Sequence, residues 1–133
     1  MRYMLDTNIC IYALKNKPAE VIENLKKHRP EEICISAVTY AELAHGVYKS
    51  QAVERNRIAL AILLANIEIL DFDVNAAQMY GRIRADLEKE GTPIGTLDMM
   101  IAAHAQSLDY VVVTNNTKEF ARVKNLRIEN WAI

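Results

Sequence analysis

Five short apolar runs alternate along the chain with longer stretches of helical periodicity. The runs are of strand length, several are rich in valine or isoleucine, and they lie at Tyr3–Leu5, Ile33–Ile35, Ile67–Leu70, Tyr110–Val113 and, more weakly, Leu126–Ile128. Apolar residues recur at three- and four-residue spacing over Ile9–Leu14, Ala19–Lys27, Ala37–Tyr48, Val53–Leu64, Val74–Glu90 and Leu97–Leu108. Strands that alternate with helices favour a parallel sheet covered on both faces. The pattern therefore predicts an α/β fold.

Residues at the ends of these stretches support the predicted helices. Pro18 suits a first helical turn, and Gly91, followed by a proline, suits the end of the Val74–Glu90 helix. Ser36, Asp73 and Thr96 each stand directly before a predicted helix, where a side-chain oxygen caps the first free amides.

Length and composition predict one soluble domain. The 133 residues, 51% hydrophobic and 25% charged, fit a single domain over residues 1–133. The longest apolar run, Ile58–Ala65, is far shorter than the ~20 residues that span a bilayer, and Arg2 interrupts any leader-like start. Cys10 and Cys34 lack metal-site spacing and are expected to be buried free thiols, which favours a cytoplasmic location.

Three acidic residues stand where an α/β sheet places its chemistry, outside the carboxyl ends of the strands. Asp6 directly follows the first strand, although a helix cap or an Asx turn is an alternative reason for an aspartate there. Glu42 lies on a mostly apolar helix and is expected to face inward, or to form a salt bridge at the boundary. Asp98 shares a helical stripe with Ile101 and Ala102, although the helix dipole also favours an acid at that position.

Gathered carboxylates repel one another unless a cation neutralises them. All-oxygen ligands suit Mg²⁺, for which Mn²⁺ substitutes, and magnesium commonly meets phosphate substrates. The net charge of −1 argues against a protein that holds nucleic acid by bulk positive charge, but without these three acids the chain has 14 acids against 16 bases. Eight basic residues are candidates to flank the acids, or are ordinary surface charges: Lys15, Lys17, Lys49, Arg55, Arg82, Arg84, Lys118 and Arg122.

Four ordered motifs resemble those of the PIN domains of the VapC toxin family. They are Met4-Leu5-Asp6-Thr7-Asn8, Thr39-Tyr40-Ala41-Glu42-Leu43, Ile94-Gly95-Thr96-Leu97-Asp98 with Ile101–Ala105, and Thr114-Asn115-Asn116-Thr117-Lys118-Glu119-Phe120. The resemblance covers essentially the whole chain and implies a three-layer α/β/α fold around a parallel sheet of about five strands. It implies a metal-dependent ribonuclease toxin, and the branch with this start and end resembles toxins that cut initiator tRNA in the anticodon stem-loop.

The resemblance also implies roles and partners. Asp6, Glu42 and Asp98 would form the acidic site, with Asp6 and Asp98 holding the principal Mg²⁺. Many PIN domains carry an aspartate after the fourth strand where this chain has Asn115 and Asn116, so Glu119 is the candidate fourth acid. Small polar residues that match orienting positions are Thr7, Asn8 and Thr114. Expected partners are a VapB-like antitoxin and a second copy of the chain in a homodimer or larger assembly, with Ala19–Lys27 and Val53–Leu64 as possible contact faces or simply core helices.

The predicted reaction is hydrolysis of an RNA phosphodiester by a metal-activated water, which leaves 5′-phosphate and 3′-hydroxyl ends. Glu42 would complete the site or help to deprotonate the water, and Glu119 would assist a second ion. With 7% aromatic residues, the chain is expected to read a folded stem-loop rather than to stack bases. Two alternatives are a non-catalytic PIN-like binding module and a receiver- or dehalogenase-like phosphotransfer domain, although Asp6-Thr7-Asn8 lacks the further aspartates that the latter needs.

Overall fold

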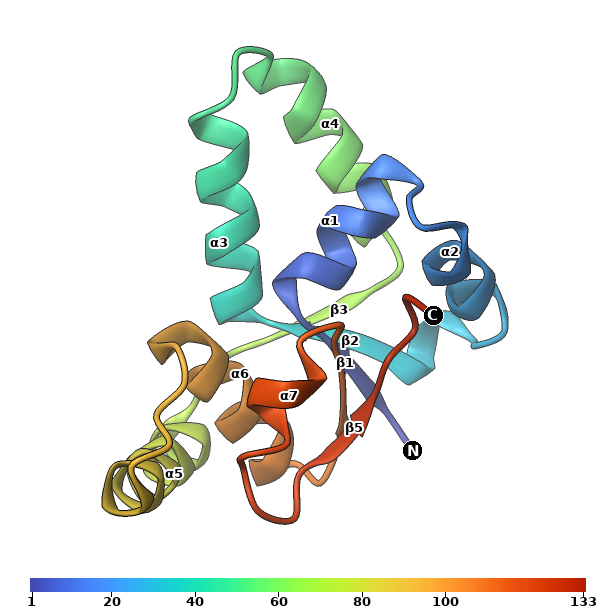
Figure 1. Ribbon diagram of the computed structural model, residues 1–133. Coiled ribbons are helices and arrows are strands. Elements are labelled where there is room, and N and C mark those ends of the chain that lie inside the picture. The colour runs from blue at the N-terminus through green and yellow to red at the C-terminus, as the bar shows by residue number, and fades with distance from the viewer.

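The computed structural model describes residues Met1 to Ile133 (Figure 1). Its elements in chain order are β1 (Tyr3–Leu5), α1 (Thr7–Lys15), α2 (Ala19–Lys26), a 3₁₀ helix η1 (Pro30–Glu32), β2 (Ile33–Ser36), α3 (Ala37–Tyr48), α4 (Val53–Leu64), β3 (Glu68–Leu70), α5 (Val74–Glu90), α6 (Thr96–Ser107), β4 (Val111–Val113), α7 (Thr117–Phe120) and β5 (Arg127–Glu129). Each helix and strand predicted from the sequence is present, with ends shifted by at most two residues. Only η1 and α7 were not predicted, because they are too short to show a period.

The five strands form one parallel sheet in the order β3-β2-β1-β4-β5. The chain builds the sheet outward from β1 to β3, then returns and continues from β4 on the other side of β1. The strand order therefore reverses between β1 and β4, and ligands of such sheets bind outside the carboxyl ends of the strands at this point. Asp6 and Thr114, which directly follow these two strands, lie at that position.

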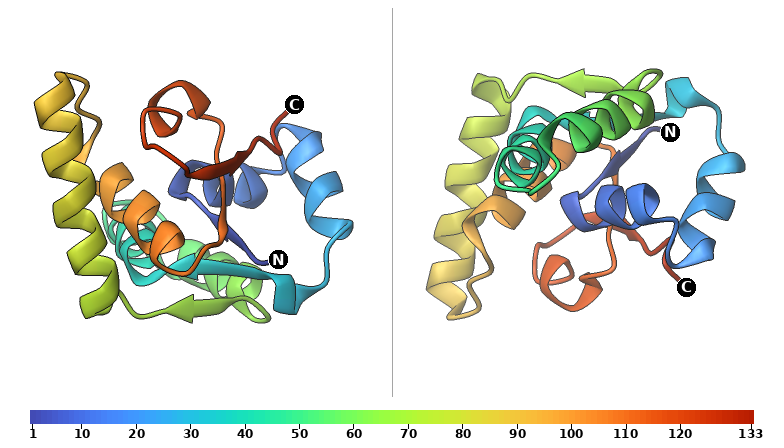
Figure 2. Two further views of the ribbon diagram at one scale, coloured as in Figure 1. Left: turned by 90° about the horizontal axis from the view of Figure 1, so that it is seen from below. Right: turned by 90° about the horizontal axis from the view of Figure 1, so that it is seen from above.

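Apolar residues on the two faces of the sheet form two separate cores. Met4, Cys34 and Val112 face a cluster built largely from α5, α6 and the α7 segment, whereas Leu5 and Val113 face a cluster built from α1 to α4. Successive strand residues point to opposite faces, so each short strand contributes to both cores. Helices on both faces confirm the predicted three-layer α/β/α architecture. The views from below and above show that α6 lies between α5 and the rest of the molecule (Figure 2).

The cap predictions are confirmed at three helix ends and wrong at one. Ser36 accepts from the Val38 amide, Asp73 caps α5, and Gly91 ends α5 in the left-handed region with φ 70°. Thr96 is not a cap: Gly95 takes that position, and its carbonyl accepts the Met99 amide at 2.9 Å. Because glycine tolerates the cap conformation, the helix starts one residue early and Thr96 is its first helical residue.

Pro18, expected inside the first turn of a helix, stands at the cap position directly before α2. Cys10 and Cys34 are buried free thiols, as predicted. None of the helices is long and apolar enough to cross a lipid bilayer.

Helices α3 and α4 pack against each other and project together from the upper side of the molecule in Figure 1, with α1 beside their base. Ile58 and Ile62 of α4 stay exposed, whereas Leu60 and Leu64 are buried. In contrast, the apolar side of α2 packs on the core through Val21. Core burial therefore accounts for Val21, while Ile22 and Leu25 pack against the core and remain partly exposed.

Candidate active site

Asp6 is held in place by the end of one strand and the start of one helix. Its amide donates to the Val113 carbonyl at 3.0 Å, which continues the pairing of β1 with β4. Its carboxylate accepts the Ile9 amide at 2.9 Å and so caps α1. Only 2% of the residue is exposed. Asp6 can therefore cap α1 and also serve as a site residue at the strand switch, because the cap bond uses only one of its two carboxylate oxygens.

Glu42 projects from α3 toward the start of α1. The Thr7 hydroxyl donates to its Oε1 at 2.5 Å, across 35 residues of sequence. The side chain is half-buried and forms a hydrogen bond here rather than the salt bridge that the sequence left open. Because Thr7 directly follows Asp6, this bond fixes Glu42 relative to the capping aspartate.

Asp98 and Glu119 are joined by one amide side chain. The Nδ2 of Asn116 donates to Asp98 Oδ2 at 3.4 Å and to Glu119 Oε2 at 3.0 Å. The Asn116 backbone amide donates to the Thr114 hydroxyl, which ties this turn to the end of β4. No role for Asn116 was predicted from the sequence, so this bridge was missed. Its place after a strand and three residues before an acid was the available signal.

Burial and neighbouring acids raise the pKa of both aspartates. Burial raises the pKa of Asp6 from 3.8 to about 6; the charges of Asp98 and Glu42 add to this, and the Thr114 hydroxyl and the Ile9 amide oppose it. Burial also raises the pKa of Asp98, and the nearby charges of Glu119 and Glu42 act in the same direction. The four predicted acids, from four separate segments, therefore share one electrostatic environment.

The donor set fits a hard divalent cation. It consists of carboxylate oxygens, with no buried lysine or arginine paired to them. As the side chains stand, no three acidic, histidine or cysteine groups are gathered closely enough to hold an ion jointly. Magnesium commonly uses only one or two carboxylates and completes its shell with water and substrate phosphate. The residues present therefore suit Mg²⁺ better than a cation that needs a full protein cage.

Two asparagines differ from Thr7 and Thr114: Asn8, which was predicted to orient the acids, and Asn115. Asn8 is exposed and forms no hydrogen bond with the acids. Asn115 turns away from the acids: it donates to the Tyr12 hydroxyl at 3.4 Å and accepts from Asn130 at 3.1 Å. Of the two asparagines after β4, only Asn116 belongs to the acidic cluster.

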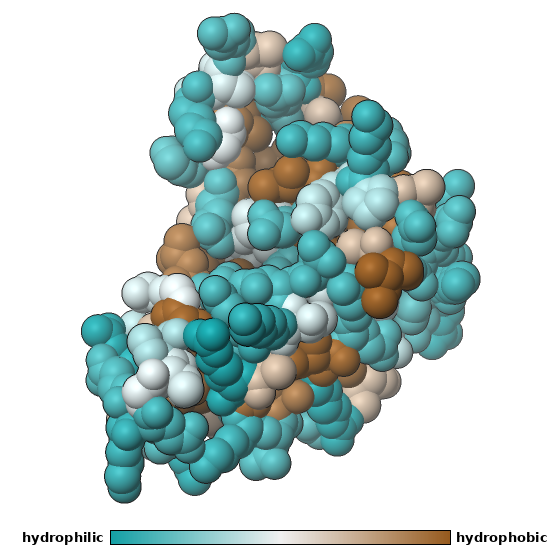
Figure 3. Space-filling view, viewed as in Figure 1, coloured by the Kyte–Doolittle hydropathy of each residue, from teal (hydrophilic) through white to brown (hydrophobic).

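An apolar groove begins at the acidic cluster. A recess of about 320 Å³ between α1, α3 and α4 is lined by Glu42, Lys15 and a set of largely apolar or small residues: Ile11, Leu14, Leu43, Gly46, Val47, Asn56 and Ala59. Hydrophobic surface is visible in the hollow beside α1 and the α3–α4 pair (Figure 3). Of the eight basic candidates, Lys15 borders this groove and Lys118 is next to Glu119 in α7.

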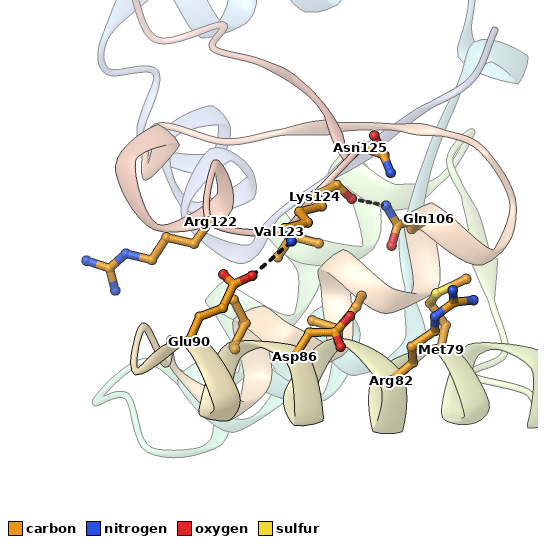
Figure 4. Close-up of a pocket in the computed structure, with 11 residues that line it drawn as sticks. Met79, Arg82, Asp86, Glu90, Gln106, Arg122, Val123, Lys124 and Asn125 are labelled. Atoms are coloured by element: carbon orange, nitrogen blue, oxygen red, sulfur yellow. Dashed lines mark hydrogen bonds and ion pairs between the residues drawn. The ribbon is translucent and has the colours of Figure 1, made fainter.

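A second pocket, of about 340 Å³, lies away from the acids, between α5 and the segment after α7 (Figure 4). Arg82 and Arg122 line it together with Asp86 and Glu90, and Lys124 pairs with Glu90 at 2.9 Å. On the same helix, Arg84 pairs with Glu88. These basic residues of α5 are thus balanced by neighbouring acids.

The five-stranded parallel sheet covered by helices on both faces is the fold of the PIN-domain class. A family model described as PIN domain matches residues 3–126. A Shigella flexneri protein named "tRNA(fMet)-specific endonuclease VapC" is 48% identical over 132 residues, which are 99% of each chain. The chain belongs to the VapC family of PIN domains.

Solved structures of this family share the fold along nearly the whole chain. A chain in the crystal structure of DNA-bound VapBC from Salmonella typhimurium superposes with a TM-score of 0.93 at 46% identity, covering 98% of both chains. A chain of VapBC2 from Rickettsia felis, bound to a DNA fragment from its promoter, gives a TM-score of 0.92 at 44% identity, covering 98% of this chain and 99% of that one. The family resemblance read from the four motifs is confirmed.

Proposed function

We propose that this chain is the toxin of a toxin–antitoxin pair and a metal-dependent endoribonuclease that hydrolyses RNA phosphodiesters. The observation that carries the proposal is electrostatic: burial and the charges of Asp98 and Glu42 raise the pKa of Asp6, at the strand switch point, to about 6. Glu119 and Glu42 act on Asp98 in the same direction. Such an arrangement costs stability, and a bound cation reverses that cost. The names of the relatives as ribonucleases support the same chemistry.

The proposed protein acts as one domain over residues 1–133. Each of the four acids has a proposed role in the reaction. Asp6 and Asp98 would hold the Mg²⁺, Glu42 would complete the site or help to deprotonate the attacking water, and Glu119 would assist a second ion. When bound, the ion lowers the pKa of water and neutralises charge on the phosphate. Thr7 holds Glu42, and Asn116 holds Asp98 and Glu119, so the carboxylates are positioned before the substrate arrives.

The proposed substrate is initiator tRNA, cut in the anticodon stem-loop. The proposed compartment, where this substrate is found, is the cytoplasm. Relatives at 48% and 47% identity from Shigella flexneri and Salmonella typhimurium are named as tRNA(fMet)-specific endonucleases. The acids contact only phosphate, so the choice of RNA must come from surfaces around them that fit a folded stem-loop.

The proposed partners are a VapB-like antitoxin and a second copy of the chain. The superposed structures are VapBC complexes, which supports the first. The groove between α1, α3 and α4 suits an apolar segment of the antitoxin, and the adjoining acids suit a basic side chain that blocks them. The exposed Ile58 and Ile62 of α4 are candidates for the homodimer contact.

Incubation with purified tRNAs tests this function. The antitoxin-free protein with Mg²⁺ or Mn²⁺ is expected to cut initiator tRNA and to spare a pool of other tRNAs, leaving 5′-phosphate and 3′-hydroxyl ends. EDTA is expected to abolish cleavage, and the substitution Asp98→Asn is expected to reduce it strongly. RNA binding without cleavage under any metal, by folded protein, would instead establish a non-catalytic binding module.

Removing the hydroxyl that holds Glu42 should slow the reaction without unfolding the domain. Thr7→Val keeps the shape of the side chain but loses the bond to Glu42, so cleavage should fall about tenfold, as is typical of groups that orient metal-site residues. Thr7→Ser keeps the hydroxyl and should retain most of the activity. Single-turnover rates of both variants make the comparison, and equal rates for Thr7→Val and the wild type would refute the orienting role.

A further inference from the structure

A buried hydrogen bond connects the two helices that carry Glu42 and Asp98. His104 Nδ1 and the Ser36 hydroxyl lie 2.7 Å apart, across 68 residues of sequence. Ser36 is fully buried, and His104 is 2% exposed. Neither residue belongs to the acidic cluster, yet such a polar pair inside an apolar core is costly unless its geometry is maintained.

Ser36 ties this bond to the start of α3. It is the last residue of β2, and its hydroxyl accepts the Val38 amide at 3.1 Å as the helix cap. One hydroxyl therefore contacts the central sheet, the first turn of α3 and the His104 ring. Any movement of α6 relative to β2 must break one of these contacts.

His104 is packed on its other side by an aromatic ring. Phe72 meets the imidazole edge-on with ring centres 5.5 Å apart. Burial lowers the pKa of His104, so the ring is neutral near pH 7 and pairs with the hydroxyl without a buried charge. The ring is thus confined by one directional bond and one aromatic contact.

The bond lies close to both acids along their helices. Glu42 follows Ser36 by less than two helical turns, and Asp98 precedes His104 by less than two turns. Helices α3 and α6 also contact each other. A fixed point between them therefore sets how far apart the two carboxylates stand.

Apolar contacts account for most of the packing of α6. Its buried face combines Met99 and Ile101 with the small residues Ala102, Ala103 and Ala105. Hydrophobic contacts are not directional, whereas a hydrogen bond is. On this otherwise apolar face, the His104–Ser36 bond supplies a directional contact.

We propose that His104 is a positioning residue for the acidic site, and that its hydrogen bond to Ser36 sets the placement of Asp98 relative to Glu42. This inference rests on the proposed nuclease function. In this role His104 contacts neither RNA nor the ion. Substituting His104 should therefore change metal binding and kcat rather than the affinity for RNA.

Two substitutions at His104 test the inference. His104→Leu fills the space without the bond, and His104→Asn places an amide near the position of Nδ1 and restores it. For His104→Leu we expect Mn²⁺ binding, measured by calorimetry without RNA, to weaken at least about tenfold and kcat to fall similarly, with KM for RNA unchanged. His104→Asn should recover both quantities to within about threefold of the wild type.

A control separates positioning from loss of stability. Val111→Ala removes buried volume at the amino end of β4, the opposite edge of the sheet, and should leave Mn²⁺ binding and kcat unchanged. If His104→Leu kept the Mn²⁺ affinity and kcat of the wild type, the inference would be overturned while the nuclease function stood. The same holds if His104→Asn folded but failed to restore Mn²⁺ binding and kcat. A wild type that neither binds Mn²⁺ nor cuts RNA would instead refute the proposed function and, with it, this inference.

Discussion

Asp6→Asn is expected to stabilise the metal-free protein at pH 8 by about 2 kcal/mol while abolishing RNA cleavage. The folded state raises the pKa of Asp6 from 3.8 to about 6. It therefore binds a proton more tightly than the unfolded chain, so the free energy of unfolding falls as pH rises from about 4 to about 6 and stays low above that window. At 1.36 kcal/mol per pKa unit the full penalty is about 3 kcal/mol, and asparagine, which does not ionise, avoids it.

The asparagine retains the structural part of the role of Asp6. Its Oδ1 can accept the Ile9 amide, and asparagine caps helices about as well as aspartate. Urea unfolding in EDTA at pH 4, 6 and 8 measures the effect, and the difference between variant and wild type should grow across this range. Asp73→Asn, at the exposed cap of α5, is the matched control and should show a much smaller difference. Identical pH dependence of wild type and Asp6→Asn would contradict the raised pKa.

Asp98→Asn is expected to reduce RNA cleavage about a thousandfold, the equivalent of about 4 kcal/mol of lost transition-state stabilisation. Glu119→Gln should cost only about tenfold. The difference follows from the proposed roles, because Asp98 binds the principal ion whereas Glu119 serves a second one. Asn116 donates to both residues, so the neutral side chains should still fit the same hydrogen-bonded turn.

Single-turnover rates at saturating Mn²⁺ give this comparison, with Asp86→Asn on the exposed side of α5 as the control of equal charge change. Equal losses at positions 98 and 119 would mean that both acids hold the principal ion. Full activity of Asp98→Asn would refute the proposed metal site.

Local patterns were sufficient to predict the elements of the fold. The strands and long helices are present because apolar periodicity and caps such as Ser36 and Asp73 act over a few residues. Thr96 shows the limit of that reasoning, since a neighbouring glycine could take the cap position equally well. The short helix α7 could not be predicted from periodicity, because a single turn has none.

Residue order along the chain was enough to predict the α/β class, the alternation of elements and the four family motifs, since these depend on neighbouring residues. Which polar groups meet depends instead on how the chain folds in three dimensions. The Thr7–Glu42 bond, the Asn116 bridge and the His104–Ser36 pair each join segments through side-chain distances of a few ångströms. Sheet order and helix packing set those distances. They also set the burial that raises the pKa of Asp6. The spacing of residues along the chain predicts neither these side-chain distances nor the burial of Asp6.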